Sequence, residues 1–191
     1  TPGKQIVLYG HSGSGKSTLL ALLLGACRPD EGVIMVADRD LADIDVATWQ
    51  QRVAWLPQRP LLFAGTLADN VRLGEPDARD AEVTAALAAA AADFVVELPD
   101  GLQTHLGDNG SGLSAGERQR VALARVILRI RRRDSTLVLL DEPTAHLDGA
   151  TEARVVLALA ETCAGRTTVV ATHRHAPAAA ADHVYPLGVA G

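Results

Sequence analysis

Short apolar runs alternate along the chain with longer segments of helical character. The runs predicted to be strands are residues 6–9, 32–36, 53–56, 136–140, 167–171 and 184–187. The segments predicted to be helices are residues 17–24, 45–51, 67–71, 80–92, 113–131 and 150–163. Continuous apolar strands that alternate with helices are typical of a sheet buried on both faces. The pattern therefore predicts an α/β protein with a mainly parallel sheet flanked by helices.

Two of the helical segments allow a second interpretation. Residues 80–92 are so rich in alanine that a low-complexity tract is the alternative, but Val83, Leu87 and Phe94 are spaced for one face and favour a packed helix. In the longest helix, Ser114 and Glu117 form a capping box, which contributes about 1 kcal/mol to the start of a helix. Capping alone would account for both residues, and it is compatible with a functional role for them as well.

Four arginines gather at the end of the longest predicted helix, at positions 129, 131, 132 and 133. Cations are favourable there because the carboxyl end of a helix carries a partial negative charge. A solvated helix end is the interpretation we favour over a nucleic-acid patch, since the cluster is short.

Composition narrows the class of protein. The chain has 191 residues, enough for one domain with a core, and 48% of them are apolar although only 3% are aromatic. The net charge of −5 does not favour a nucleic-acid partner. Cys27 and Cys163 form neither a disulfide framework nor a metal spacing, which indicates thiols in a reducing compartment. We expect no signal peptide and no membrane span in this sequence, and its start close to the first strand suggests a domain of a longer protein.

A glycine-rich segment between the first strand and the first helix carries the strongest chemical signal. It has the spacing Gly-x4-Gly-Lys-Ser and consists of Gly10, His11, Ser12, Gly13, Ser14, Gly15, Lys16, Ser17 and Thr18. Between a strand and a helix, such a loop turns its backbone N–H groups toward a phosphate. Lys16 would reach the β- and γ-phosphates and the Ser17 hydroxyl would hold Mg²⁺. The alternative is a surface turn with an incidental lysine, and the flanking elements favour the nucleotide site.

Polar residues end two further strands. Asp141 and Glu142 follow residues 136–140, and His173 follows residues 167–171. In an open parallel sheet the carboxyl ends of the strands line the ligand crevice, so we expect these residues near the glycine loop. Asp141 is suited to Mg²⁺, Glu142 to polarising an attacking water, and His173 to sensing the γ-phosphate.

In these residues the chain resembles the nucleotide-binding domain of ATP-binding cassette (ABC) transporters over essentially its whole length. The matching motifs are the phosphate loop, the glutamine loop at Gln58, the signature at residues 113–117, the acidic motif at residues 137–142, the D-loop with Asp148, and the switch histidine His173. The segments at 62–66 and 104–110 look like the exporter branch. The sequence from Asp141 to Asp148 further resembles the exporters of cysteine and glutathione that support cytochrome bd assembly.

The resemblance implies an architecture and partners. It implies a core formed by residues 1–58 and 132–191, an inserted helical subdomain at 59–131 that carries the signature, and N-terminal antiparallel strands that are largely missing. The cofactors would be ATP and Mg²⁺. A second such domain, identical or related, would face this one head to tail, and a transmembrane domain would place the pair at the cytoplasmic face of the plasma (inner) membrane.

The resemblance also assigns roles to residues outside the phosphate loop. Ser114, Ala115, Gly116 and Glu117 would contact the ATP that the partner's phosphate loop holds. Gln58 would contact Mg²⁺ and the attacking water. Where the family has glycine and glutamine, this signature has Ala115 and Glu117. The aromatic residue on which the family stacks adenine lies in a segment that this sequence does not include, so we expect weaker ATP binding than by the full protein.

Two other functions remain open at this point. One is a soluble ABC ATPase that acts on nucleic acid or ribosomes. The other is a regulatory nucleotide-binding half of a heterodimer, although the presence of Glu142 and His173 favours a hydrolysing half. The leading hypothesis is an ATPase domain that couples ATP-driven dimerisation and hydrolysis to export.

Overall fold

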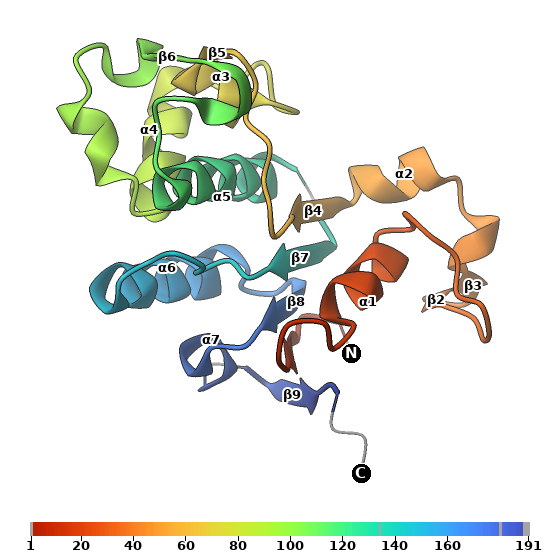
Figure 1. Ribbon diagram of the computed structural model, residues 1–191. Coiled ribbons are helices and arrows are strands. Elements are labelled where there is room, and N and C mark those ends of the chain that lie inside the picture. The colour runs from red at the N-terminus through yellow and green to blue at the C-terminus, as the bar shows by residue number, and fades with distance from the viewer. Residues whose placement is uncertain (1, 134, 180, 189–191) are drawn as a thin grey trace. The chain divides into compact units, whose positions relative to one another are not determined.

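The computed structural model describes residues 2–133, 135–179 and 181–188. The chain forms two compact units (Figure 1). Unit 1 comprises Thr1–Trp55, Asp134–Glu142 and Gly165–Gly191, and unit 2 comprises Leu56–Arg133 and Pro143–Ala164. Each unit is described by itself below.

Unit 1 is built on a mainly parallel sheet with the strand order β4-β7-β8-β1-β9. Its strands are β1 (Gln5–Tyr9), β4 (Val53–Leu56), β7 (Leu137–Asp141), β8 (Thr167–Thr172) and β9 (His183–Pro186). Strand β8 pairs in parallel with both β7 and β1, and β9 pairs in parallel with β1. Tyr9 lies opposite Thr172, and Asp141 lies opposite Ala171. The polar strand ends expected from the sequence therefore meet at one edge of the sheet, which confirms the predicted fold class.

Apolar residues of this sheet and of the adjoining helices form the core of unit 1. The helices are α1 (Lys16–Leu23), α2 (Val46–Gln51) and α7 (His175–Ala179). Leu20 from α1 and Trp49 from α2 are buried in one cluster with strand residues such as Leu139. The indole Nε1 of Trp49 donates to the backbone oxygen of Leu23 over 2.9 Å, which fixes α2 against the end of α1.

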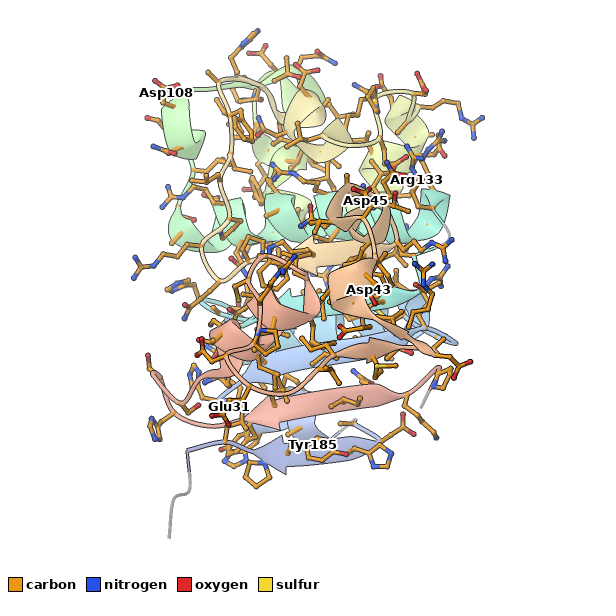
Figure 2. All side chains as sticks on the ribbon, turned by 90° about the vertical axis from the view of Figure 1, so that its right-hand side faces the viewer. Glu31, Asp43, Asp45, Asp108, Arg133 and Tyr185 are labelled. Atoms are coloured by element: carbon orange, nitrogen blue, oxygen red, sulfur yellow. The ribbon has the colours of Figure 1, made fainter. Side chains whose placement is uncertain are left out.

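Two residues labelled in Figure 2 mark the start of α2 and the outer strand β9. Asp45 caps α2, and its Oδ1 accepts from the amide of Thr48 over 2.9 Å. Tyr185 is exposed on β9, the last strand at one edge of the sheet (Figure 2). Strand β9 is exposed along its length, whereas the inner strands β7 and β8 are mostly buried. Asp141 and Thr172 end these two buried strands.

One predicted strand is much shorter in the structure. Residues 32–36 were expected to be extended throughout, but only β2 (Met35–Val36) is, and it pairs antiparallel with β3 (Arg39–Asp40) in a small separate hairpin. Gly32 has a φ of +82° and breaks the extended backbone before the hairpin begins. The full-length strand prediction was wrong for this reason.

Unit 2 is mainly helical. Its helices are α3 (Leu67–Arg72), α4 (Asp80–Ala89), α5 (Ala115–Arg132) and α6 (Gly149–Thr162). It also has short 3-10 helices η2 (Asp93–Glu97), η3 (Gly101–Gln103) and η4 (Asp108–Gly110), and a two-stranded antiparallel sheet of β5 (Gly65–Thr66) and β6 (His105–Leu106). In Figure 1, α3 and α4 lie beside the longest helix, α5, and both contact it. Val83 and Leu87 are buried, so the alanine-rich segment is a packed helix. Phe94, expected on the same helix face, lies beyond the helix end in η2.

Arg131, Arg132 and Arg133 at the end of α5 are exposed, and two of them also form ion pairs. Glu75 is only 5% exposed, and Arg133 donates from Nε to its Oε1 over 2.7 Å. Arg132 donates from Nη1 to Glu82 over 2.9 Å. Arg133 is labelled in Figure 2 at this end of α5. The exposure of Arg131, Arg132 and Arg133 agrees with a solvated helix end, and acidic residues from α4 and the preceding loop add ion pairs to it.

The contacts divide the chain at slightly different places from the expected domains. Residues 1–58 and 132–191 were expected to form the core, and 59–131 the helical subdomain. In the structure Pro143–Ala164 groups with unit 2, because α6 packs against α4 and α5. Among the described residues, no helix is both long and apolar enough to cross a membrane.

Candidate active site

The glycine loop links the end of β1 to the start of α1. Gly15 occupies the cap position of α1 with a φ of +89°, and Gly13 has a φ of +82°. Both values lie in the left-handed region, where glycine is favoured. Among the described residues, no side chain caps α1, and its first turn holds no acidic residue. The helix start therefore leaves its backbone N–H groups and its partial positive charge available to an anion.

Lys16 is folded back over the loop that precedes it. Its side chain is buried, with 6% exposed, and its Nζ donates to the backbone oxygens of Gly10 over 2.7 Å and His11 over 2.9 Å. An ammonium group has three donors, so one remains for a ligand. The lysine thus holds the loop in shape and brings a positive charge to it.

Close backbone contacts explain the first glycine of the loop. A Cβ at Gly10 would lie 2.6 Å from the backbone oxygen of Leu187 and 2.7 Å from Oγ of Ser14. His11 donates from Nδ1 to the backbone oxygen of Ser12 over 2.7 Å. The expected phosphate-loop residues form one continuous structure, in which Ser12, Ser17 and Thr18 are exposed.

Asp141 ends β7 with its side chain only 2% exposed. Burial raises the pKa of its carboxyl group, and the neighbouring charge of Glu142 also raises it, while a hydrogen bond from Ser17 and the charge of Lys16 lower it. Its Oδ1 is buried and has no hydrogen-bond partner among the described residues. An orphaned carboxylate oxygen beside a hydroxyl is a suitable pair of ligands for a hard cation, so Ser17 and Asp141 fit Mg²⁺.

Glu142 follows Asp141 with a backbone that few non-glycine residues adopt. Its φ is +50°, and its amide donates to the backbone oxygen of Ala171 over 2.8 Å. Such backbone strain occurs mainly where the surrounding structure imposes it, as at active sites. The turn aims the carboxylate across to the end of β8.

Two residues of that strand end bind the Glu142 carboxylate, which is 5% exposed. His173 donates from Nδ1 to Oε1 over 2.8 Å, and buried Thr172 donates from Oγ1 to Oε2 over 3.3 Å. The imidazole itself is 60% exposed, so its other nitrogen can meet a ligand. The sequence identified Glu142 and His173 separately but did not assign a role to Thr172. The only feature of the sequence that could have indicated Thr172 was its position directly before His173.

The signature residues lie at the start of α5 in unit 2. Oγ of Ser114 accepts from the amide of Glu117 over 3.3 Å, and the Glu117 carboxylate accepts from the amide of Ser114 over 2.7 Å. The predicted capping box is confirmed. These hydrogen bonds from Ser114 lower the pKa of Glu117, and the charge of Arg120 adds to the effect. Ala115, between them, is exposed.

Gly116 brings the signature helix against the D-loop of the same unit. A Cβ at this position would lie 3.1 Å from the backbone oxygen of His146, whose own φ is +61°. Asp148 then caps α6, because its Oδ1 accepts from the amides of Ala150 and Thr151, each over 3.0 Å. Hydrogen bonds from Thr151 accordingly lower the pKa of Asp148.

The structure brings only some of the predicted site residues together. Unit 1 gathers the phosphate loop, Asp141, Glu142 and His173 at the carboxyl edge of its sheet. Gln58, the signature residues and Asp148 belong to unit 2, and Gln58 is exposed in the segment after β4. The phosphate-binding and catalytic candidates thus form one site, and the signature forms a second, separately positioned feature.

A phosphate loop before a helix, with paired carboxylates and a histidine at neighbouring strand ends, defines a P-loop nucleotide-binding domain. The sequence profile of the family described as ABC transporter matches residues 1–145. The chain therefore belongs to the ABC transporter family.

Known relatives place it in more detail. It is 42% identical over 183 residues to an ATP-dependent lipid A-core flippase of Chromohalobacter salexigens, covering 95% of this chain and 31% of that protein. It is 44% identical over 174 residues to a beta-(1→2)glucan export ATP-binding/permease protein of Rhodopseudomonas palustris, covering 91% of this chain and 28% of that protein. A mycobactin import ATP-binding/permease protein of Mycolicibacterium thermoresistibile is 41% identical over 184 residues, with 96% of this chain and 31% of that protein covered.

The fold agrees with a solved relative. The structure of a bacterial Atm1-family ABC exporter with ATP bound matches with a TM-score of 0.89 and 35% identity, covering 98% of this chain and 32% of that one. The chain thus spans less than a third of the relatives described here. It corresponds to their nucleotide-binding domain.

Proposed function

We propose that this chain binds and hydrolyses ATP as the nucleotide-binding domain of an ABC exporter. The observation that carries the proposal is the Glu142 carboxylate, held by His173 and Thr172 at the sheet edge where the phosphate loop also begins. A phosphate cradle alone would support binding only. A buried, oriented carboxylate beside it supplies the general base that hydrolysis requires.

The residues of unit 1 divide the chemistry among them. The loop amides and Lys16 would bind the phosphates, and Ser17 and Asp141 would hold Mg²⁺, which would neutralise phosphate charge. Gln58, which belongs to unit 2, is an expected further ligand of Mg²⁺. Glu142 accepts a hydrogen bond from the attacking water and takes up its proton. The water oxygen forms the new bond to the γ-phosphorus, and the bond to the β,γ-bridging oxygen breaks, giving ADP and phosphate. His173 keeps the carboxylate in place and presents its second nitrogen to the γ-phosphate.

The second half of the proposal concerns partners. Two such domains would face each other head to tail, so that the signature of one, residues 114–117, meets the ATP held by the other, with Ser114 and Gly116 at the γ-phosphate. The start of α5 suits this role because a helix N-terminus favours an anion. Asp148 and the D-loop would support the signature through the close contact between Gly116 and His146. A transmembrane domain would anchor the pair at the cytoplasmic face of the plasma (inner) membrane.

The experiment that tests the proposal is ATP turnover by the whole chain and by Glu142→Gln. The amide cannot accept the proton of the attacking water, so we expect kcat to fall on the order of 10²-fold or more. ATP affinity, measured by calorimetry, should stay within about threefold because the phosphate loop is unchanged. Glu97→Gln, an exposed carboxylate on η2, is the matched control. Full turnover by Glu142→Gln would remove that residue from its role.

The transported substrate is a finer proposal. The relatives described above are named for lipid A-core flipping, glucan export and mycobactin import, so close sequence similarity spans several substrates. The sequence from Asp141 to Asp148 favours cysteine or glutathione as the exported molecule. Transport of either thiol into vesicles by the full-length protein would support this assignment, and transport of neither would reject it.

Two alternatives are less well supported. A soluble ABC ATPase that acts on nucleic acid or ribosomes does not fit the net charge of −5, and the relatives described above carry transport names. A regulatory half of a heterodimer would not need the Glu142–His173 pair. Measurable turnover by this chain with a partner that lacks its own catalytic glutamate would exclude the regulatory alternative.

A further inference from the structure

The carboxylate of Glu117 occupies the place at the start of α5 where an anion would bind. Its Oε2 lies 2.7 Å from the backbone nitrogen of Ser114 and accepts that hydrogen bond. The Glu117 amide is in turn bonded to Oγ of Ser114 over 3.3 Å. Two donors of the helix start are therefore already satisfied within the chain, and a negative charge stands beside them.

The remaining donors at the start of α5 are the amides of Ala115 and Gly116, which lie within two residues of Glu117 in the chain. Among the residues that the structure describes, no hydrogen bond accounts for the amides of Ala115 and Gly116, and the first bond of α5 runs from the amide of Arg118 to the oxygen of Ser114. These two amides are the ones free to meet an incoming phosphate. A phosphate that approached them would come within a few ångströms of an ionised carboxylate, and like charges at that separation repel strongly outside bulk water.

Neighbouring cations offset this charge only in part. Arg118 donates from Nη1 to the oxygen of Leu113 over 2.6 Å, so its guanidinium is committed to the loop before the helix. Arg120 lies over the ring of Phe94, 5.2 Å from its centroid, and attracts Glu117 from one turn further along α5. Arg118 is bonded to the loop before the helix, and Nη1 of Arg120 lies 3.7 Å from where a Cβ on Gly116 would be, so Arg120 reduces the negative charge beside the signature without replacing the carboxylate at the Ser114 amide.

We propose that Glu117 acts as a built-in brake on the signature, competing as an internal anion with the γ-phosphate of the partner's ATP. This inference rests on the proposed function, because it requires the signature to meet a nucleotide. The brake weakens association of two domains around ATP, and it is released when the carboxylate turns away from the Ser114 amide. Glutamine at this position keeps the cap without the charge.

The test measures ATP-driven dimerisation of the whole chain by sedimentation, with Glu142→Gln present throughout so that ATP persists. Adding Glu117→Gln should lower the ATP concentration for half-maximal dimer on the order of tenfold at low salt. The gain should shrink at about 0.5 M salt, where exposed charges are screened within a few ångströms. A purely structural role of Glu117 would not give this salt dependence.

Two further variants make the result specific. Glu117→Ala removes both charge and cap, so it should also tighten the dimer while lowering the melting temperature. Asp69→Asn alters a capping box of the same design at Thr66 on α3, outside the proposed nucleotide contacts, and should leave dimerisation unchanged. Equal or weaker dimerisation by Glu117→Gln would overturn the brake. Absence of any ATP-dependent dimer in every variant, with ATP bound, would instead refute the proposed sandwich and the brake with it.

Discussion

The starts of α1 and α5 are two versions of the same anion-binding element. Helix α1 begins at Gly15, in a left-handed conformation without a side-chain cap and without an acidic residue in its first turn. Helix α5 begins at Ser114 with a complete capping box and a carboxylate in its first turn. The first leaves its amides open to an anion, at a cost in helix stability, whereas the second is stable by itself and, in the proposed brake, would exchange its own anion for an external one.

In the proposed function, this difference would let one domain bind a nucleotide and still require a partner. The open start of α1 lies in unit 1 with Lys16, Asp141 and Glu142, which in the proposed function bind and act on the phosphates. The closed start of α5 lies in unit 2, and its close contact with the D-loop ties it to α6. We infer that ATP binds first at the open element and that the closed one responds afterwards.

Removing the cation from the open element should have the largest effect on binding. Lys16→Ala deletes the ammonium that bonds the oxygens of Gly10 and His11, so the loop loses both its charge and an internal support. We expect ATP affinity, measured by calorimetry, to fall on the order of tenfold to a hundredfold.

The control for that variant is Lys4→Ala, which removes an exposed pair with Asp182 elsewhere in unit 1. Exposed pairs contribute about 0–1 kcal/mol, and this one does not touch the loop. Equal losses of affinity in the two variants would show that net charge alone, rather than the position of Lys16, determines binding.

Alanine in place of the glycine at each helix start should separate the two elements further. Gly15→Ala meets no atom within 4 Å, but its φ of +89° strains any side chain, so we expect a loss of about 1–2 kcal/mol in unfolding free energy. Gly116→Ala has a helical backbone and instead places a Cβ 3.1 Å from the oxygen of His146. Its gain in helix propensity should offset much of that crowding, leaving global stability within about 0.5 kcal/mol.

The readouts for this pair differ accordingly. Denaturant unfolding should detect Gly15→Ala, while amide hydrogen exchange at residues 144–148 should detect Gly116→Ala as faster opening of the D-loop. Unchanged exchange there would show that the D-loop does not depend on the close approach of α5.

The smallest expected effect is on thermal stability, and it comes from an ion pair near the C-terminal end of α5. Glu82 pairs with Arg132 near the end of α5, and a backbone hydrogen bond from Arg79, followed by hydrogen bonds from Arg132 and Arg79, lowers its pKa from 4.5 to about 2. A lowered folded-state pKa stabilises the protein above the unfolded-state value and loses that contribution as the pH falls. Glu82→Gln should therefore lower the melting temperature slightly at neutral pH.

The pH dependence is the decisive part of this prediction. The difference between the parent chain and Glu82→Gln should shrink as the pH falls from 4.5 to about 2, where the parent carboxylate also becomes neutral. Glu97→Gln, exposed on η2, serves as the control in the same melting series. A constant difference across this range would mean that shape, rather than charge, is what the glutamate contributes.

The sequence alone determined the elements whose signals are local. The phosphate loop, the capping box at Ser114, the apolar strands and the parallel α/β class all depend on residues within one or two turns of each other, so short-range spacing was sufficient to predict them. Tertiary structure decided the rest, because it depends on contacts between residues far apart in the chain. Strand order brings Thr172 beside Glu142, and a left-handed backbone at Glu142 aims its carboxylate there. Likewise, folding buries Glu75 among the arginines of α5, although the two lie more than fifty residues apart in the chain.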